Sequence, residues 1–357
     1  MNVGKWNGLL LLLLISSIGF GQNADSVLEK SSLIKRSSFT PIPILSYSRS
    51  YGATVGVMLN AFTIINKKDT ISPPTMTGVG IGYTQNKSWF AIAFQRLFLK
   101  QDKLRVVWAL GLGKTNFQFF QETDDLGNGV FVDYKTHTKF VSATVTYNIF
   151  SRFYTGLKYQ YSKSTTEFDV ANQPDQIANL SGFGLPVSFD NRDYVYNPAK
   201  GWNINAVFNN NAKWMGSDIE FSSLSFNANN YTRLNSKGVL ASRFFVYGGL
   251  GNVPFIGQKV VGGKDLRGYT KGAYRSNSVA ALQTEYRYNF YKKWGAVAFG
   301  GIANAFKVNG ISGSGILPAA GFGVRYLVIP KQRMNMGFDA AVGKNDWGVY
   351  FRIGEAF

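Results

Sequence analysis

One segment of the chain combines a basic loop with a strand that carries a carboxylate. It spans residues 260–290, VVGGKDLRGYTKGAYRSNSVAALQTEYRYNF. In its second half apolar and polar residues alternate, which predicts a strand with Glu285 on the polar face. The Gly- and Lys-rich part before it predicts a long loop that carries Arg267, Gly268 and Tyr269, and loops of this length usually serve a function. If the loop folds back, Arg267 can form a charge-assisted pair with Glu285; an exposed loop tripeptide is the alternative.

A second charged group lies further upstream. Asp190, Arg192 and Asp193 come shortly before Pro198 and Gly201, two residue types that are typical of turns. We interpret the three charges as an ion cluster that stabilises a turn, rather than as a catalytic dyad.

The sequence carries no recognisable catalytic or nucleotide motif. Gly262-Gly263-Lys264 is followed by Asp265, and Gly257 is one position too far away for a phosphate-binding loop. The nucleophile elbow G-x-S-x-G is absent. The chain has no cysteine, which excludes disulfides, cysteine-ligated metals and a lipid anchor on cysteine. We therefore predict no catalytic residue, no metal and no cofactor.

His137 is the only histidine, so a site with several histidine ligands is excluded. We expect it in an outer loop, as an ordinary surface residue. A hydrolase that uses His137 is the enzyme-class alternative, and hydrolysis that persists in a His137→Ala variant would end it.

The N-terminus predicts export from the cytoplasm. Residues 1–21 read as a signal peptide, with Lys5, an apolar run over residues 9–18 and small residues before Gln22. Residues 22–40 form a short segment without room for a folded domain, and residues 41–357 form the main domain. The net charge of +18 is scattered over an exported chain, which argues against nucleic acid as a partner and favours outer-membrane lipid and anionic glycolipid.

The main domain predicts an all-β fold, because periods of two residues recur and helical periods are scarce. Most of the expected strands have the ~9–11 residues that cross a bilayer at a tilt. The sixteen strands are expected at residues 42–49, 52–65, 75–85, 88–99, 103–119, 138–149, 153–167, 180–191, 202–213, 218–234, 239–252, 278–290, 294–306, 316–328, 334–344 and 347–357.

The lengths of the connections distinguish a membrane barrel from a soluble sandwich. Most links on one side are turns of a few residues, such as 100–102, 151–152 and 291–293, whereas links on the other side are long, such as 120–137 and 253–277. Short inner turns and long outer loops, with an even number of strands, are typical of antiparallel outer-membrane barrels. Closure is required because lipid cannot satisfy a free sheet edge.

The first and last strands form the expected seam of this barrel. Pro41 and Pro43 open the first strand, and proline is confined to strand starts and edges. Simple strand initiation is one reading; weak pairing that lets the seam open toward lipid is the other. Phe357 ends the last strand on the far side of the seam.

Three segments resemble the barrel domain of the outer-membrane assembly and translocation superfamily, which includes BamA, TamA and the two-partner-secretion translocators (bacterial surface antigen type). They are VGGKDLRGY, FDNRDYVYNPAKG (Phe189–Gly201) and GVYFRIGEAF, and the likeness extends from Pro41 to Phe357. The resemblance implies a 16-stranded transmembrane β-barrel of the bacterial outer membrane whose sixth outer loop folds inward.

The resemblance also implies roles for individual residues. Arg267, Gly268 and Tyr269 match the tip of the inward-folded loop, and Glu285 matches the acid that holds the arginine. Asp190, Arg192, Asp193, Pro198 and Gly201 match an inner-turn motif, and the end at Phe357 resembles a barrel-insertion signal.

Two departures from the family qualify this likeness. Relatives usually place an Asp on the thirteenth strand, where this chain reads AFGGIANAF, so we expect Asp339 or Asn304 to take its place. Relatives also carry periplasmic POTRA modules that receive client chains, and we expect none here.

Two functions from different classes follow. The first is insertion or export of polypeptides together with other envelope proteins, with the loop as a latch and the seam as a gate. The alternative is a passive or plugged channel for small solutes.

Overall fold

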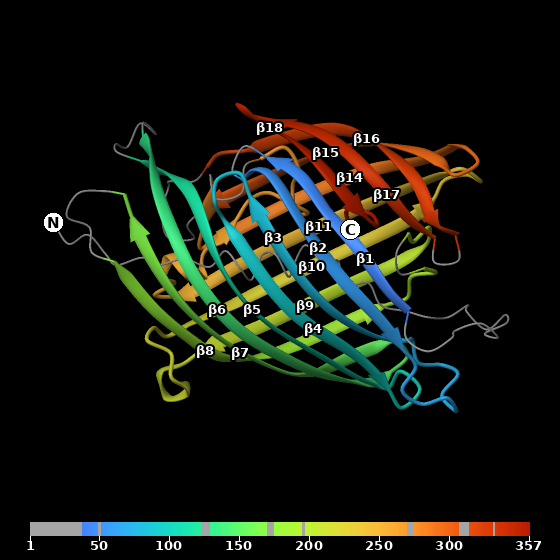
Figure 1. The fold of residues 1–357 in the computed structure, drawn as a ribbon, viewed down its shortest axis with the longest axis horizontal. Coiled ribbons are helices and arrows are strands. Elements are labelled where there is room, and N and C mark those ends of the chain that lie inside the picture. Colours follow the sequence, from blue (N-terminus) through green and yellow to red (C-terminus); the bar gives the residue numbers. More distant parts are fainter. Residues whose placement is uncertain are drawn as a thin grey trace.

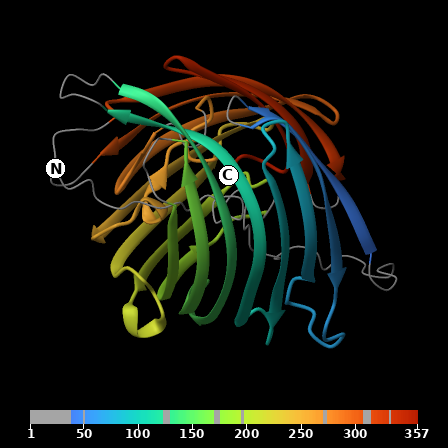
Figure 2. The ribbon, with the colours of Figure 1, turned by 60° about the vertical axis from the view of Figure 1, so that its left-hand side comes forward.

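The structure is a computed structural model that describes residues 38–48, 51–122, 129–169, 175–194, 197–269, 274–306, 314–330 and 333–357. The predicted signal peptide and nearly all of the predicted segment 22–40 lie outside these ranges. The described residues form an antiparallel β-barrel of sixteen strands (Figures 1 and 2), which confirms the predicted fold class and strand number. The barrel strands are β1 (Ser38–Ser48), β2 (Gly52–Thr63), β3 (Thr75–Thr84), β4 (Trp89–Leu99), β5 (Leu104–Glu122), β6 (Gly129–Phe150), β7 (Phe153–Phe168), β8 (Gln176–Asp190), β9 (Gly201–Asn211), β10 (Phe221–Arg233), β11 (Gly238–Gly251), β14 (Ser278–Tyr291), β15 (Trp294–Phe306), β16 (Leu317–Ile329), β17 (Met334–Gly343) and β18 (Asp346–Ile353).

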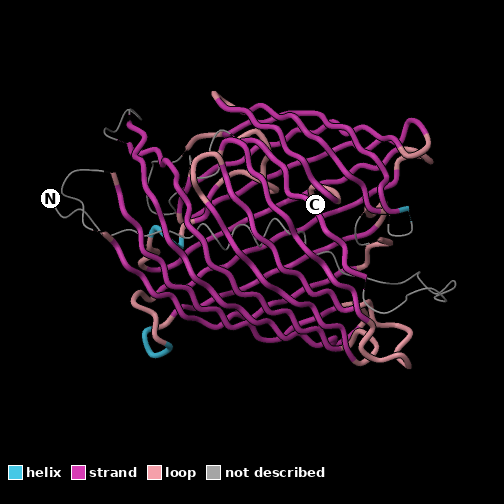
Figure 3. Tube along the Cα trace, viewed as in Figure 1, coloured by secondary structure: helices cyan, strands magenta, loops and turns pink. Residues whose placement is uncertain are grey.

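Each barrel strand pairs with the barrel strands that precede and follow it in the chain, and β1 pairs with β18 to close the ring. The connection between β11 and β14 contains a separate two-stranded sheet, β12 (Lys259–Val260) with β13 (Arg275–Ser276). Two short 3-10 helices, η1 (Lys213–Met215) and η2 (Phe255–Gly257), complete the regular elements of the described ranges (Figure 3). None of the described helices is long and apolar enough to cross a membrane.

The alternation of side chains explains why this sequence forms a ring with an apolar outside. On β14, Leu282 is 46% exposed, whereas Gln283 and Glu285 are buried. Exposed apolar residues recur on the same outer face around the barrel, for example Val79 and Val342. A soluble barrel would bury such residues; an outer apolar band with polar groups inside is the arrangement that lipid requires.

The hairpin of β5 and β6 is longer than the sequence predicts. We expected a loop over residues 120–137, but the two strands pair without interruption from Leu104↔Tyr147 to Glu122↔Gly129. His137 therefore lies on β6, exposed on its outer face, and not in a loop. The polar residues Asp133, Lys135 and His137 occupy outward positions of a regular ladder, and the residues between them are buried.

The two ends of the barrel chain also differ from the prediction. β1 begins at Ser38, so Pro41 and Pro43 lie inside the strand, and the expected boundary at residue 41 falls within it. β18 ends at Ile353, because Gly354 adopts a φ of 88° and turns the chain off the strand. β1 and β18 share three residue pairs, Ser46↔Tyr350 to Ser48↔Gly348, whereas β1 and β2 share eleven.

Candidate functional site

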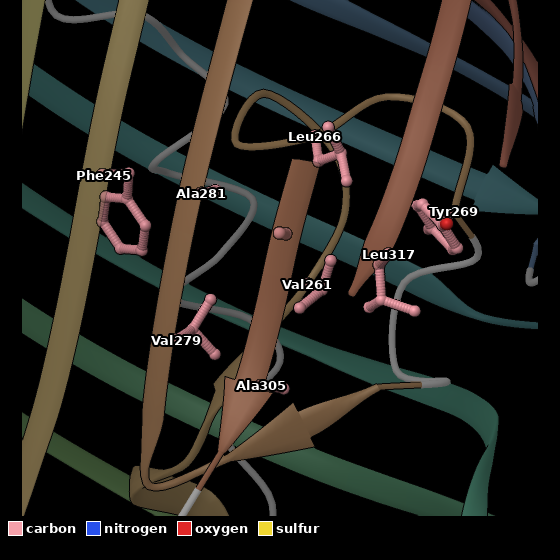
Figure 4. Packing of buried hydrophobic residues seen from close by; sticks show 9 residues of the cluster. Phe245, Val261, Leu266, Tyr269, Val279, Ala281, Ala305 and Leu317 are labelled. Atoms are coloured by element: carbon pink, nitrogen blue, oxygen red, sulfur yellow. The ribbon is translucent and has the colours of Figure 1, made fainter. Parts of the chain in front are cut away.

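The connection that precedes β14 brings the predicted loop residues against the wall of the barrel. Leu266 is fully buried and packs in one cluster with Val261, Val279, Ala281 and other small or branched residues of β14 to β16. Figure 4 shows the side chains of this cluster gathered between the connection and the neighbouring strands. Small residues such as Ala281 leave room on the wall, so that the connection can pack directly on it.

Arg267 is fully buried and contacts two carboxylates that come from different strands. Its Nη2 lies 2.6 Å from Oε2 of Glu285 on β14, and its Nη1 lies 2.8 Å from Oδ2 of Asp339 on β17. Its Nε donates to Oε1 of Gln283 at 3.2 Å. The guanidinium also stacks on Phe299 of β15, with 3.4 Å between the Cζ atom and the ring centroid. Four side chains from three strands therefore fix the position of this one cation.

The sequence offered two residues, Asp339 and Asn304, in place of the missing strand-thirteen acid. Of the two candidates, the structure places Asp339 beside Arg267. Asn304 lies between Ala303 and Ala305, which are both buried on the inner face, so its side chain points to the opposite side of β15. Since β15 supplies no acid, β17 provides it.

Both carboxylates are shared with further arginines. Asp339 Oδ1 lies 2.5 Å from Nη1 of Arg325, and its Oδ2 lies 3.0 Å from Nε of Arg352. Glu285 Oε1 lies 2.6 Å from Nε of Arg287. Buried charges are tolerated only when they are paired and hydrogen-bonded. The arginines and acids of β14, β16, β17 and β18 thus form one network, and Arg267 joins the connection to it.

Gly268 and Tyr269 hold the chain on the other side of Arg267. Gly268 has a φ of 102°, and a Cβ atom there would lie 2.8 Å from the carbonyl oxygen of Val342, so only glycine fits this approach. Its N–H donates to the hydroxyl of Tyr350 at 3.0 Å. The hydroxyl of Tyr269 donates to the carbonyl of Pro318 at 2.6 Å and accepts the N–H of Lys344 at 2.9 Å.

A further anchor, which sequence reasoning missed, lies two residues before Arg267. Asp265 is buried, and its Oδ1 lies 2.6 Å from Nη2 of Arg243 on β11. Its Oδ2 lies 3.1 Å from Nζ of Lys259. The connection is therefore held by ion pairs in which it supplies both kinds of charge. Its Asp265 pairs with a base on β11, and its Arg267 pairs with acids on β14 and β17.

Several members of the network around Arg267 were also missed by sequence reasoning. Gln283 lies on the predicted polar face of β14, and Arg325 is a lone cation within the apolar strand GFGVRYLVI. Both could therefore have been predicted from the sequence to point into the barrel. Phe299 carried no such signal, because one aromatic residue in an apolar strand is ordinary.

The end of the chain lies apart from the seam at which we expected it. Glu355 Oε2 accepts from Nε of Arg325 at 2.9 Å, and its Oε1 accepts from Nδ2 of Asn335 at 2.6 Å. The carbonyl oxygen of Phe357 accepts from Nη2 of Arg287 at 2.8 Å. The left-handed turn at Gly354 sends these residues to the arginine network, so Phe357 does not pair with β1.

The predicted inner-turn residues lie together between β8 and β9. Arg192 forms a two-pronged pair with Asp190, with Nε–Oδ1 and Nη2–Oδ2 distances of 2.9 and 2.8 Å, and both residues are buried. The Oδ1 atom of Asp193 accepts the N–H groups of Ala199 and Lys200 at 2.8 and 3.1 Å. All these contacts hold backbone or side chains of the turn itself. The buried Pro198 sits within it.

Gly201 provides a test of this turn. It has a φ of 104°, and a Cβ atom would lie 2.6 Å from the carbonyl oxygen of Asn191. We expect Gly201→Ala to lower the free energy of unfolding by about 1–3 kcal/mol, because a left-handed conformation and a backbone clash coincide. Urea unfolding followed by tryptophan fluorescence measures it. Gly216→Ala, whose φ of 88° comes with no atom within 4 Å, is the control and should cost less; equal losses would contradict the role of the clash.

The arrangement suits mechanical attachment rather than covalent chemistry. Every carboxylate of the network faces arginine, so none is placed to act as an acid or base. Among the described residues, no group of three or more His, Cys, Asp or Glu could hold a metal ion. What the site can do is hold or release the connection between β11 and β14.

Comparisons with known proteins agree with this fold. The family model described as the Omp85 superfamily domain matches residues 74–357. Among solved structures, the chain is similar to BamA from Haemophilus ducreyi lacking POTRA domains 1–3, with a TM-score of 0.62 and 13% identity, over 96% of this chain and 76% of that one.

Two CdiB structures are similar as well. CdiB from Acinetobacter baumannii has a TM-score of 0.62 and 14% identity over 90% of this chain and 60% of that one. CdiB from Escherichia coli has a TM-score of 0.63 and 12% identity over 90% and 63%, respectively. The chain thus spans less than two thirds of the length of either CdiB structure. No curated protein matches the sequence.

Proposed function

Since the chain belongs to the Omp85 superfamily and is a barrel of the bacterial outer membrane, we propose that it helps insert or export polypeptides there, together with other envelope proteins. In this role it carries out no covalent chemistry. The observation that carries the proposal is the uneven closure of the ring, in which one junction is far shorter than its neighbours.

The junction of β1 and β18 is the proposed gate. It holds three paired residues, whereas β17 pairs with β18 over eight and β1 with β2 over eleven. In an antiparallel ladder every second pair exchanges two backbone hydrogen bonds, each worth about 1 kcal/mol net, so the shortest ladder has the fewest bonds and opens first. An opening at this place would connect the inside of the barrel with the lipid.

The two prolines of β1 support this assignment. Because the β1–β2 ladder is continuous through Pro41↔Leu59 and Pro43↔Val57, the proline nitrogens must face away from β2. They therefore lie on the edge that faces the β18 side. Two donors are missing from this edge, so the ladder of β1 and β18 cannot extend in full beyond its three pairs.

The residues Arg267, Gly268 and Tyr269 are the proposed latch. Gly268 binds Tyr350, which lies on β18 and pairs with Ser46 of β1. Arg267 reaches Asp339 on β17, which also binds Arg352 of β18. The latch is thus bonded to the last strand, directly beside the gate. In this proposal its attachment sets how readily β18 leaves β1.

A disulfide across the junction tests the gate. Tyr47 and Val349 are register partners, and the chain has no cysteine of its own. We expect the oxidised Tyr47→Cys/Val349→Cys variant to lose delivery of client polypeptides, because the strands can no longer part. The measurement is quantitative proteomics of outer-membrane and exported proteins in cells whose only copy is the variant, with and without a reductant. Restoration by the reductant is part of the expected result.

The matched control places the same cross-link at a long junction. Val57 and Ile81 are register partners on β2 and β3, and both are exposed on the outer face. Val57→Cys/Ile81→Cys should leave delivery intact when oxidised. Undiminished delivery with the β1–β18 cross-link fully formed would refute the gate.

The same variants separate translocation from the second candidate, a channel for small solutes. A channel needs no strand separation, so its conductance in planar bilayers would persist with the β1–β18 cross-link in place. Robust conductance combined with unchanged envelope proteins in the cross-linked strain would favour the channel.

A further inference from the structure

The outer face of β5, β6 and β7 carries a cluster of cations just above the apolar band. On β6, the outward positions Tyr147, Val145 and Val141 are exposed and apolar, and the next two, Lys139 and His137, are exposed and polar. About 9–11 residues cross an outer membrane, and residues 141–150 of β6 account for that length. The change of side chains at Lys139 therefore marks the outer boundary of the lipid.

On the neighbouring strands, the outward side chains change from apolar to basic at the same height. On β7, Leu157 and Tyr159 are exposed, and Lys163 follows after one further outward position. On β5, the exposed Leu112 is followed by Lys114. The registers Leu112↔Lys139↔Lys163 and Lys114↔His137 place these residues in two adjacent rows across three strands.

Lys139 and Lys163 face each other directly across the β6–β7 ladder. Directly opposed side chains have Cβ atoms about 4.5–5.5 Å apart, and like charges at that distance destabilise a sheet. The structure gives neither lysine an ion pair with any residue that it describes, although Lys135, four positions along β6, pairs with Glu167. The nearest acids described on these strands, Glu167 and Asp133, lie four residues from Lys163 and six residues from Lys139, about 13 and 20 Å along the strands, and Glu167 is paired with Lys135. Within the described ranges, no acid lies at ion-pair distance from Lys139 or Lys163.

This cluster is local. On β8, β16 and β17 the exposed apolar side chains reach the outer strand ends or the residue next to them, at Ile177, Ile316 and Val342. The cations of β5 to β7 are thus a specific feature of one side of the rim and do not merely follow from the net charge of the chain.

We propose that Lys139 and Lys163, flanked by Lys114 and His137, bind the phosphate groups of a phosphorylated glycolipid in the outer leaflet. The lysines stand at the depth of lipid headgroups, and the apolar residues below them, such as Val141 and Tyr159, lie where the acyl chains of the same molecule would run. A lipid that supplies both contacts resolves the repulsion between the two lysines. This site lies on the outside of the wall and does not depend on the proposed gate.

Native mass spectrometry of the detergent-purified barrel, titrated with bis-phosphorylated lipid A, tests the site. Each surface cation near anionic lipid strengthens binding about fivefold, so Lys139→Gln/Lys163→Gln should weaken binding by roughly tenfold or more. Lys67→Gln/Lys237→Gln, which removes two exposed cations at the opposite rim, should bind like the wild type. Lipid A without phosphates should bind weakly to every form.

Folding of the variant is checked separately. Since the substitution removes a like-charge pair, the thermal unfolding of Lys139→Gln/Lys163→Gln without lipid should match or exceed that of the wild type. Equal lipid affinity of this variant and the wild type would overturn the proposal, as would equal binding of the dephosphorylated lipid. Binding of inorganic phosphate alone with the same lysine dependence would assign the site to a free anion and overturn the lipid assignment.

Discussion

Replacing Asp339 with alanine is expected to lower the free energy of unfolding by about 3–5 kcal/mol, the loss typical of a buried charge pair that is broken on one side. Asp339 is fully buried and is shared by Arg267, Arg325 and Arg352. Arg267 keeps Glu285 and Arg325 keeps Glu355, but the structure describes no other carboxylate for Arg352 at ion-pair distance. Its partly buried guanidinium is then left without a carboxylate partner among the described residues.

Unfolding in urea, followed by tryptophan fluorescence of the barrel in detergent, measures this loss. Asp339→Asn keeps the size of the side chain and part of its hydrogen bonding, so we expect a smaller loss than for alanine. Asp218→Ala removes an exposed carboxylate that accepts only from Asn179 in the described part of the chain, so it should cost clearly less than Asp339→Ala. If Asp339→Ala unfolds at the urea concentration of the wild type, the network does not stabilise the barrel.

Replacing Arg267 with methionine is expected to detach the connection from the wall and to reduce client delivery about tenfold or more. Methionine retains apolar packing on Phe299 but cannot bond to Glu285, Asp339 and Gln283. Two buried carboxylates then lose one of their cations, at a cost of about 3–5 kcal/mol, and a loss of about 1.4 kcal/mol at the latch already corresponds to a tenfold shift in its attachment.

Limited proteolysis measures the attachment, since residues 261–269 should become accessible to a protease in the variant, and proteomics of envelope proteins measures delivery. Arg267→Lys should not restore the wild-type behaviour, because an ammonium cannot make the forked contacts of a guanidinium. Arg233→Met, which removes an exposed arginine of β10, is the control. Unchanged protease sensitivity together with unchanged delivery in Arg267→Met would refute the latch.

The ring of sixteen strands was predictable because its physical cause repeats along the whole chain. Every strand needs an apolar outer face, and this requirement is visible in the sequence of each strand as an alternation of apolar and polar residues. On β14, for example, Leu282 points outward and Glu285 points inward. Turn lengths then distinguish the two rims. The β5–β6 hairpin was predicted too short, since its outer half stands above the lipid and carries Lys135 and His137 where the pattern calls for apolar residues.

The partners of Arg267 were predictable only in part. Glu285 is near in the chain and lies on the polar face of the adjacent strand. Asp339 was one of two candidates, and the choice between it and Asn304 depends on which face of its strand each occupies. Phe299 faces Glu285 across the β14–β15 ladder, and Arg352 comes from β18 next to β17; both meetings depend on strand register, which no local pattern encodes. The turn at Gly354 is also invisible in sequence, because glycine is common in this chain.

The two prolines of β1 have a consequence for any polypeptide that reaches the edge of the opened barrel. Pro41 and Pro43 offer carbonyl oxygens but no N–H on the side that faces away from β2. A guest strand added there would forfeit two hydrogen bonds, each worth about 1 kcal/mol. Such an edge can receive a strand but holds it loosely, so a guest would depart more readily than it would from an edge with every donor in place.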